Sequence, residues 1–306
     1  MPSASLALTN INGQQVILND SFGFRFVKER YTPYTQLIAE TANPEAYSFK
    51  PSAVSLTVNG YTVHSGLIDT LDYRSECGKK TVSVRSKGFT SLLCRNQMTP
   101  GMLANPSLYG LIHDYYTIPG VSCENDTSSC NYIYVEDGST MWDAVANLAQ
   151  KKYNSYPYIN DTNTVMISPP ASPSVITVSM PLCLGRRYDY RRIISSLHMQ
   201  DINGSYDVYN ATDPRAEQLN IVRNKEIRLD RQHLDNPMLS LGHKFKYAMR
   251  GSASSYSEYA GYNGEDLRDE FRCGTVGGEI SRIEIKGSGG LVRTLIDCYS
   301  DDYCNA

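Results

Sequence analysis

Four oxygen-bearing side chains at alternate positions form the main candidate for a metal site. The residues that resemble the opening of a calcium loop are Asp201, Asn203, Ser205 and Asp207. A calcium loop also needs a turn glycine at its sixth position and a bidentate carboxylate at its twelfth. Here the glycine comes at the fourth position, and Thr212 occupies the twelfth. The pattern therefore predicts a polar strand or turn rather than a calcium site.

Residues 185–192, Gly-Arg-Arg-Tyr-Asp-Tyr-Arg-Arg, mix basic and aromatic side chains. Such a mixture is typical of proteins that bind single-stranded nucleic acid. On a strand, Arg187, Asp189 and Arg191 would share one face, so the aspartate would offset much of the positive charge. We therefore interpret the segment as an exposed, self-paired strand or an intersubunit contact.

The remaining titratable and glycine-rich segments show no catalytic pattern. The five histidines lack paired ligand spacing, and Cys94 with His113 lacks a local nucleophile signature. The carboxylates of 265–270 are predicted to lie on a helix as solvated charge, because carboxylates alone do not define a glycosidase pair. The glycines of 274–278 and 287–290 lack the context of a phosphate loop. The sequence thus predicts a protein that is not an enzyme, with no catalytic, cofactor-binding or metal-ligating residue and no cofactor.

Composition and charge describe an ordinary folded chain. Of its 306 residues, 41% are hydrophobic and 20% are charged, and the formal net charge is -3. The length favours two or three domains, and the charge gives no reason to expect nucleic acid or an anionic membrane as a partner. The 23 tyrosines fit either interface surfaces or strands. The N-terminus lacks the features of a signal peptide, and no apolar run could span a membrane, so we expect synthesis in a cytoplasm.

The eight cysteines include no C-x-x-C pair, which excludes zinc-ribbon and thioredoxin-type motifs. Cys123 with Cys130, and Cys298 with Cys304, could close small loops in an oxidising environment. Without a secretion signal, free thiols are the expected state.

The strongest signals for local structure lie in residues 54–93. Asn59-Gly60 predicts a tight hairpin turn, because both turn positions need a positive φ and alternating apolar and polar residues flank them. Ser86 is the expected N-cap of a short helix that ends the segment. The strands predicted here are 54–58, 61–64, 67–73 and 81–85, with a polar loop over 74–80.

A second group of signals lies in residues 132–170. Ser139 or Thr140 can cap a helix that continues to residue 149. The negative charge of Asp143 in its first turn interacts favourably with the helix dipole. The apolar face of this helix contains Met141, Trp142, Val145, Leu148 and Ala149. Strands are predicted at 132–135, 157–159 and 164–167, and the prolines after them favour a domain junction over 168–174.

Elsewhere the patterns are weaker. A helix is predicted over 35–42, stopped by Asn43-Pro44. Residues 252–272 fit either a broken helix or a loop, and 232–237 form a turn-rich connection. The other predicted strands are 15–18, 22–27, 174–178, 193–210, 218–229, 279–285 and 291–296.

The order of elements in 54–93 resembles the first barrel of phage-tail baseplate hub proteins, the late-control-D-like hubs of contractile tails. The residues that carry this resemblance are Gly66, Ile68, Asp69, Val82, Val84, Arg85, Ser86, Leu92 and Leu93. The string G-S-T-x-W-D-x-V-x-x-L-A, with the two strands that follow it, is similar to the middle domain of the same family. From residue 172 onward the resemblance lies mainly in the order of the predicted elements.

The resemblance implies an α+β, β-dominated fold with two tail-tube-like β-barrel domains and a small α/β insert domain between them. The expected domains are 1–95 for the first barrel, 96–172 for the insert and 173–306 for the second barrel. It also implies a homotrimer, because three chains with two barrels each present six similar domains to a sixfold tube while keeping the threefold symmetry of a spike.

The partners that the resemblance implies are further copies of the chain, a tail spike protein, a tail tube or tube-initiator protein, and a tape measure protein. Neither a membrane nor a specific nucleic acid is among them, and the expected location is the baseplate of a virion tail. Two other classes stay open. One is a tail-associated cell-wall hydrolase, and the other is a secreted carbohydrate-binding β-protein stabilised by disulfides and glycans.

Overall fold

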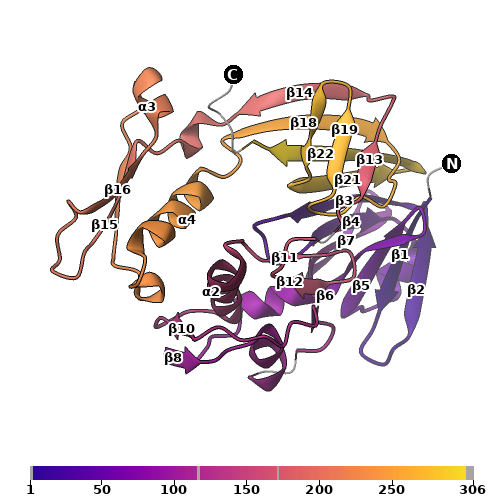
Figure 1. Ribbon diagram of the computed structural model, residues 1–306. Coiled ribbons are helices and arrows are strands. Elements are labelled where there is room, and N and C mark those ends of the chain that lie inside the picture. Colours follow the sequence, from indigo (N-terminus) through magenta and orange to yellow (C-terminus); the bar gives the residue numbers. More distant parts are fainter. Residues whose placement is uncertain (1–2, 116–117, 171, 301–306) are drawn as a thin grey trace. The chain divides into compact units, whose positions relative to one another are not determined.

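The computed structural model in Figure 1 describes residues 3–115, 118–170 and 172–300. The chain divides into two compact units, one formed by Met1–Leu184 with Ser257–Asp297 and the other by Gly185–Tyr256 with Cys298–Ala306. Strands outnumber helices in the described part of the chain, so the β-dominated α+β class is confirmed. None of the described helices is both long and apolar enough to cross a bilayer.

One large antiparallel sheet organises the first unit. Its neighbouring strands pair in an open order, and the described strands do not close into a barrel. Strands β14, β18 and β22 continue past the limits of this unit. The order is β14 (Cys183–Tyr188), β18 (Ala253–Ala260), β22 (Leu291–Tyr299), β21 (Arg282–Ser288), β3 (Phe22–Glu29), β4 (Gln36–Thr41), β7 (Lys79–Gly88), β6 (Tyr61–Glu76), β5 (Ala53–Val58), β1 (Ala4–Thr9) and β2 (Gln15–Asn19).

Strand β3 joins the two ends of the sequence within this sheet. It pairs with β4 on one side and with β21 on the other, from Arg282 opposite Glu29 to Gly287 opposite Phe24. Alternate residues of β3, among them Phe22, Phe24 and Phe26, are buried, as expected for a strand with one face on a core. In Figure 1 the yellow β21 therefore lies beside the indigo β3.

The predicted hairpin turn is confirmed, with φ of 51° at Asn59 and 86° at Gly60. The polar loop predicted for 74–80 is wrong, because β6 and β7 continue pairing as far as Glu76 and Lys79. The actual turn is Cys77-Gly78, with φ of 48° and 79°. Both faces of this part of the ribbon are exposed or half-buried, so its strands lack the alternating pattern that marks a buried face.

In the N-terminal third, the helix predicted over 35–42 is wrong, and so is the N-cap predicted at Ser86. Residues 36–41 form β4, whose alternate residues are buried between β3 and β7, so tertiary pairing overrides a modest helix propensity. Asn43-Pro44 starts a short helix, α1 (Pro44–Ser48), because the Asn43 side chain caps it and proline suits a first helical position. Ser86 lies in β7 and caps nothing, and the short helix that follows is the 3-10 turn η1 (Phe89–Cys94).

The predicted helix of the middle segment is α2 (Met141–Tyr153). Thr140 and Asp143 form a capping box at its start, in which each side chain accepts a hydrogen bond from the other's backbone N–H. All five residues of the predicted apolar face are buried in one core cluster. The surrounding elements are β8 (Gly101–Ala104), η2 (Gly110–Asp114), β9 (Ser122–Cys123), β10 (Tyr132–Val135), β11 (Tyr158–Ile159) and β12 (Thr164–Met166).

A small sheet completes the first unit, with β19 (Glu270–Cys273) between β13 (Val175–Thr177) and β20 (Val276–Glu279). The helix predicted for 265–270 is wrong, because these residues form a turn that enters β19. The strands predicted over 279–285 and 291–296 are confirmed as β21 and β22, which pair as a hairpin whose turn residues Gly289 and Gly290 both have a positive φ.

The second unit is a three-stranded sheet with a helix on one face. Its core contains Leu197, Met199 and Leu241. The long strands predicted for 193–210 and 218–229 are wrong: the strands are β15 (Ser196–Met199), β16 (Tyr209–Thr212) and β17 (Asn224–Ile227). Helix α4 (Pro237–Met249) was not predicted, although the Asn236 side chain caps it and a proline occupies its first position, because Gly242 at its centre weakens the helical pattern. The other helical segments of this unit are η3 (Tyr190–Arg192), α3 (Pro214–Gln218) and η4 (Arg231–His233).

Candidate functional site

The calcium-like string forms a self-contained polar turn, as predicted. Asp201 Oδ1 accepts hydrogen bonds from the backbone N–H of Asn203 at 2.9 Å and of Ser205 at 2.8 Å. Ser205 Oγ donates in turn to Asp207 at 3.0 Å. These oxygens are therefore directed at the local backbone and at one another. Across the described ranges, no group of three or more His, Cys, Asp or Glu side chains is placed to hold a metal ion.

The basic and aromatic segment 185–192 is self-paired, but not along one strand. Strand β14 ends at Tyr188, and Asp189 caps η3, so the predicted shared face is wrong. The guanidinium of Arg191 binds both carboxylate oxygens of Asp189, at 2.8 and 3.0 Å. This pairing holds the pKa of Asp189 below its usual value, so the aspartate offsets charge as expected.

The cysteines show no sign of an activated thiol. His113 Nε2 lies 3.7 Å from Cys123 Sγ, and burial raises the pKa of Cys94 to about 11 and also that of Cys123. A raised pKa disfavours the thiolate, which is the reactive form. The described cysteines, Cys123 and Cys130 included, are free thiols, whereas Cys304 lies outside the described residues.

A buried hydrogen-bond chain passes from Thr35 through His64 to Ser86. Thr35 Oγ1 is 2.7 Å from His64 Nδ1, and His64 Nε2 is 2.9 Å from Ser86 Oγ, which donates to the carbonyl of Leu67 at 2.7 Å. Burial lowers the pKa of His64 to about 3, so the ring is neutral. A histidine hydrogen-bonded to a serine resembles part of a catalytic triad, but the three side chains are buried and the Ser86 hydroxyl already donates to the carbonyl of Leu67. These hydrogen bonds therefore connect β6 and β7 to Thr35, the residue that precedes β4.

Of the carboxylates predicted as solvated charge, Glu265 is buried, whereas Asp266, Asp269 and Glu270 are half-buried. Glu265 is 1% exposed, and it accepts hydrogen bonds from the hydroxyl of Tyr259 and from the backbone N–H of Asn263 at 3.1 Å. Burial also raises the pKa of Tyr259 and Tyr262. The spacing of the acidic residues fits a helix surface, and the residues around them show no period that would have indicated burial.

The Asp266 side chain connects three segments that are remote in sequence. Its carboxylate forms an ion pair with Lys28 of β3 and accepts the backbone N–H groups of Asp161 and Leu267, both at 2.7 Å. The side chains of Lys28 and Asp266 are only 7% and 18% exposed. Burial raises the pKa of Asp266 although the Lys28 ammonium opposes the shift. The pair therefore stands in a poorly solvated environment.

A second set of charges reinforces the junction of β3, β21 and β22. Glu284 binds Arg25 of β3 at 2.7 Å and Lys286 at 3.0 Å, and it also pairs with Arg282. Arg282 reaches Asp297 of β22 at 2.8 Å. Burial works against ionisation of Glu284, but hydrogen bonds from Arg25, Lys286 and Arg282 lower its pKa to about 2. Strand pairing and charge together hold this junction.

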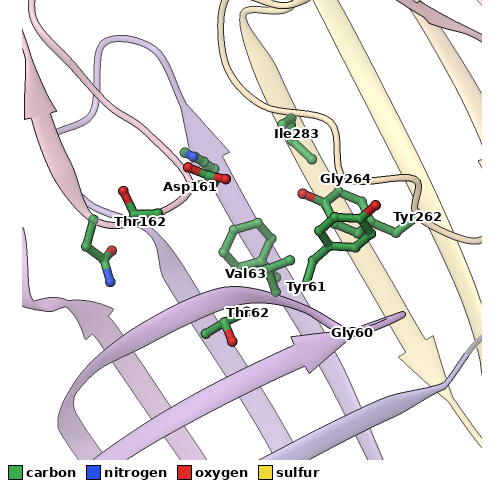
Figure 2. A pocket seen from close by; sticks show the side chains of 12 residues that line it. Gly60, Tyr61, Thr62, Val63, Asp161, Thr162, Tyr262, Gly264 and Ile283 are labelled. Atoms are coloured by element: carbon green, nitrogen blue, oxygen red, sulfur yellow. The ribbon is translucent and has the colours of Figure 1, made fainter. Parts of the chain in front are cut away.

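A pocket of about 350 Å³ opens beside the Asp266 junction. It is lined by the tip of the β5–β6 hairpin, the loop 161–163 and the loop 262–264, together with Lys28 and other residues of β3 and β21. Figure 2 shows Asp161 and Thr162 on one side of it and Tyr61, Tyr262 and Gly264 on the other. Asn59 Nδ2 donates to the carbonyl of Tyr262 at 2.8 Å and ties two of these segments together.

The fold described above is also found in solved phage tail proteins. The tail protein from Neisseria meningitidis MC58 is 12% identical, with a TM-score of 0.71 over 98% of this chain and 97% of that chain. The 43 kDa tail protein of prophage MuSo2 from Shewanella oneidensis is 14% identical, with a TM-score of 0.71 over 98% of both chains. The predicted resemblance to phage tail proteins is thus confirmed at the level of the fold.

A type VI secretion protein shows the same likeness more weakly. The E. coli c3393 protein, described as similar in structure to the T4 tail proteins gp27 and gp5, is 9% identical, with a TM-score of 0.52 over 92% of this chain and 74% of that chain. No family model and no curated protein sequence matches the chain.

Proposed function

We propose that this chain is the structural hub of a phage or phage-like tail baseplate. The observation that carries the proposal is the match of the fold to solved tail proteins over 98% of the chain. Because one fold can serve several functions, the chemistry of the site matters as well. The buried charges of Asp266 and Glu284 bind other parts of the same chain, which suits a rigid structural part better than a catalyst.

The proposed hub is a homotrimer that joins a threefold spike to a sixfold tail tube. Its tube-like domains are 1–95 and 173–306, with the insert 96–172 between them, so three chains bring six similar domains to the ring. The pairing of β3 with β21 supports this arrangement, because it couples the two proposed tube-like domains through one sheet. Its partners are then a spike protein, a tube or tube-initiator protein and a tape measure protein, in the baseplate of a contractile tail assembled in the host cytoplasm.

Strand β2 provides an edge at which copies of the chain can pair. It is the last strand of the large sheet, so one side of its backbone has no strand partner among the described strands. An open edge is a template for another chain. Ile17 of β2 is 58% exposed, and an apolar side chain there favours contact with a neighbouring copy.

The mass of the assembled particle tests the proposal. Light scattering after gel filtration is expected to give three times the chain mass of 34.2 kDa for the chain alone, and that mass plus the mass of the spike when a candidate spike is bound. Ile17→Lys is expected to weaken the trimer. Ile11→Lys is the matched control, because Ile11 lies in the turn before β2 and is 87% exposed. A monomer under every assembly condition would contradict the hub proposal.

We propose no catalytic role for this chain. The hydrogen-bond chain through His64 is buried, and the carboxylates of Asp266 and Glu284 are bound by other parts of the chain. A peptidoglycan-degradation assay is therefore expected to show no activity. Clear activity that a single carboxylate substitution abolishes would favour the cell-wall hydrolase instead.

A further inference from the structure

We propose that the pocket beside the Asp266 junction binds a guanidinium group, such as that of an arginine side chain. The inference is independent of the hub proposal, because it rests only on the charges, rings and volume of the pocket. Three features carry it: an uncompensated carboxylate at the rim, two tyrosine rings set at a right angle, and a size that suits a single side chain.

The charge of the pocket favours a cation. Asp161 is exposed at the rim, and within the described ranges no ion pair neutralises it. Its backbone N–H is bound to Asp266, which fixes the position of the loop while leaving the carboxylate available. Lys28 also lines the pocket, but its ammonium is paired with Asp266. The buried carboxylate of Glu265 lies next to Gly264 in the chain and adds to the negative potential.

The tyrosines form a fixed aromatic corner. The rings of Tyr61 and Tyr262 are 5.7 Å apart between centroids and perpendicular, with an interplanar angle of 89°. The Tyr262 hydroxyl donates to the carbonyl of Glu265 at 2.7 Å, which fixes that ring. A Cβ at Gly264 would lie 2.7 Å from the Tyr61 ring, so the glycine allows the ring to pack against the backbone. Aromatic faces attract cations within about 6 Å.

A guanidinium fits this arrangement better than an ammonium. It is planar, it stacks on aromatic rings and it binds a carboxylate through two parallel N–H groups. Thr62 and Asn163, whose side chains carry oxygen atoms, also line the pocket. At about 350 Å³ the pocket lies at the small end of ligand sites, which span roughly 300–1,000 Å³. It can hold one side chain but not an extended cofactor.

Titration with small arginine analogues, followed by calorimetry or by NMR of the protein, tests the proposal. N-acetylargininamide is expected to bind with a Kd on the order of 1 mM. The neutral isostere N-acetylcitrullinamide is expected to bind at least about tenfold more weakly, because it lacks the charge that a carboxylate recognises. N-acetyllysinamide is expected to fall between the two.

Two pairs of variants locate the binding. Asp161→Asn is expected to weaken N-acetylargininamide binding about tenfold, whereas Glu76→Gln, at the exposed tip of the β6–β7 hairpin, leaves it unchanged. Tyr61→Ala is expected to weaken it about threefold. Tyr109→Ala is its control, because both tyrosines are 50% exposed. Fluorescence of the buried Trp142 checks that every variant is folded.

Equal binding of the citrulline or lysine analogue overturns the guanidinium assignment. Unchanged binding in Asp161→Asn, or equal losses in a variant and its control, overturns the assignment to this pocket. A comparison with free L-arginine identifies the source of the group. Tighter binding of the capped amide indicates an arginine within a polypeptide, because its α-amino and α-carboxyl groups are blocked as amides, as they are in a chain. Tighter binding of free arginine, which carries both charged groups, indicates a small molecule.

Discussion

Removal of the Asp266 charge is the most direct test of how the first unit is held together. Asp266→Asn keeps the size of the side chain but leaves Lys28 as a buried cation without its counter-charge. Asparagine also has one acceptor oxygen in place of two, so either Lys28 or the N–H of Asp161 loses its partner. Breaking a buried ion pair in this way costs about 3–5 kcal/mol.

The expected loss lies near the lower limit of that range. Asp266 is partly accessible, at 18%, so some water can solvate the remaining cation. A loss of about 3 kcal/mol is still a large part of the 5–15 kcal/mol that stabilises a typical domain. Lys28→Met combined with Asp266→Asn removes both charges and keeps the apolar stem, so it is expected to cost only about 1 kcal/mol. The two positions are therefore expected to be strongly coupled.

Urea unfolding followed by tryptophan fluorescence measures these losses. Trp142, the single tryptophan of the chain, is 4% exposed in the core around α2. Asp72→Asn, which removes an exposed partner of Arg74, is the control and is expected to change stability by less than about 0.5 kcal/mol. A loss below about 1 kcal/mol for Asp266→Asn would refute the reasoning. A double variant whose loss of stability equals the sum of the losses of the two single variants would also refute it.

Three further changes test other parts of the structure. The pKa of His64 is about 3 in the folded chain and near 6.5 when unfolded, so the unfolded chain binds more protons between these values and stability falls as the pH drops below 6.5. Urea titrations are expected to show a loss of about 2 kcal/mol by pH 5, and a smaller loss for His64→Gln. Gly66→Ala would place a Cβ 2.1 Å from the carbonyl oxygen of Lys87, whereas a Cβ at Gly23 would be 3.9 Å from its nearest atom. Thermal melts are expected to show a loss of stability above about 2 kcal/mol for Gly66→Ala and below about 1 kcal/mol for Gly23→Ala. Thr140→Ala removes the capping box of α2 and is expected to lower the free energy of unfolding by about 1 kcal/mol in the Trp142 fluorescence assay. Thr140→Ser is expected to be nearly as stable as the original chain, because serine is also a good N-cap.

Short-range signals in the sequence determined several elements of this protein correctly. The Asn59-Gly60 turn follows from two residues that tolerate a positive φ. Helix α2 follows from its Thr140 cap and its apolar period. The polar turn at 201–205 follows from the tendency of aspartate to bind the backbone two residues on. In each case the energies that decide the conformation act within one turn or one short element, so the neighbouring residues are sufficient to predict it.

Only the tertiary structure decided the junctions on which the candidate site depends. Arg25 and Glu284 are separated by 259 residues in the chain, and no local pattern indicates that β3 pairs with β21. Residues 36–41 became a strand because two neighbouring strands offered backbone partners. Glu265 is buried and Asp266 is half-buried because folding brings Tyr259 and Lys28 to them. These outcomes depend on which partner is available after folding, and a local stretch of sequence does not contain that information.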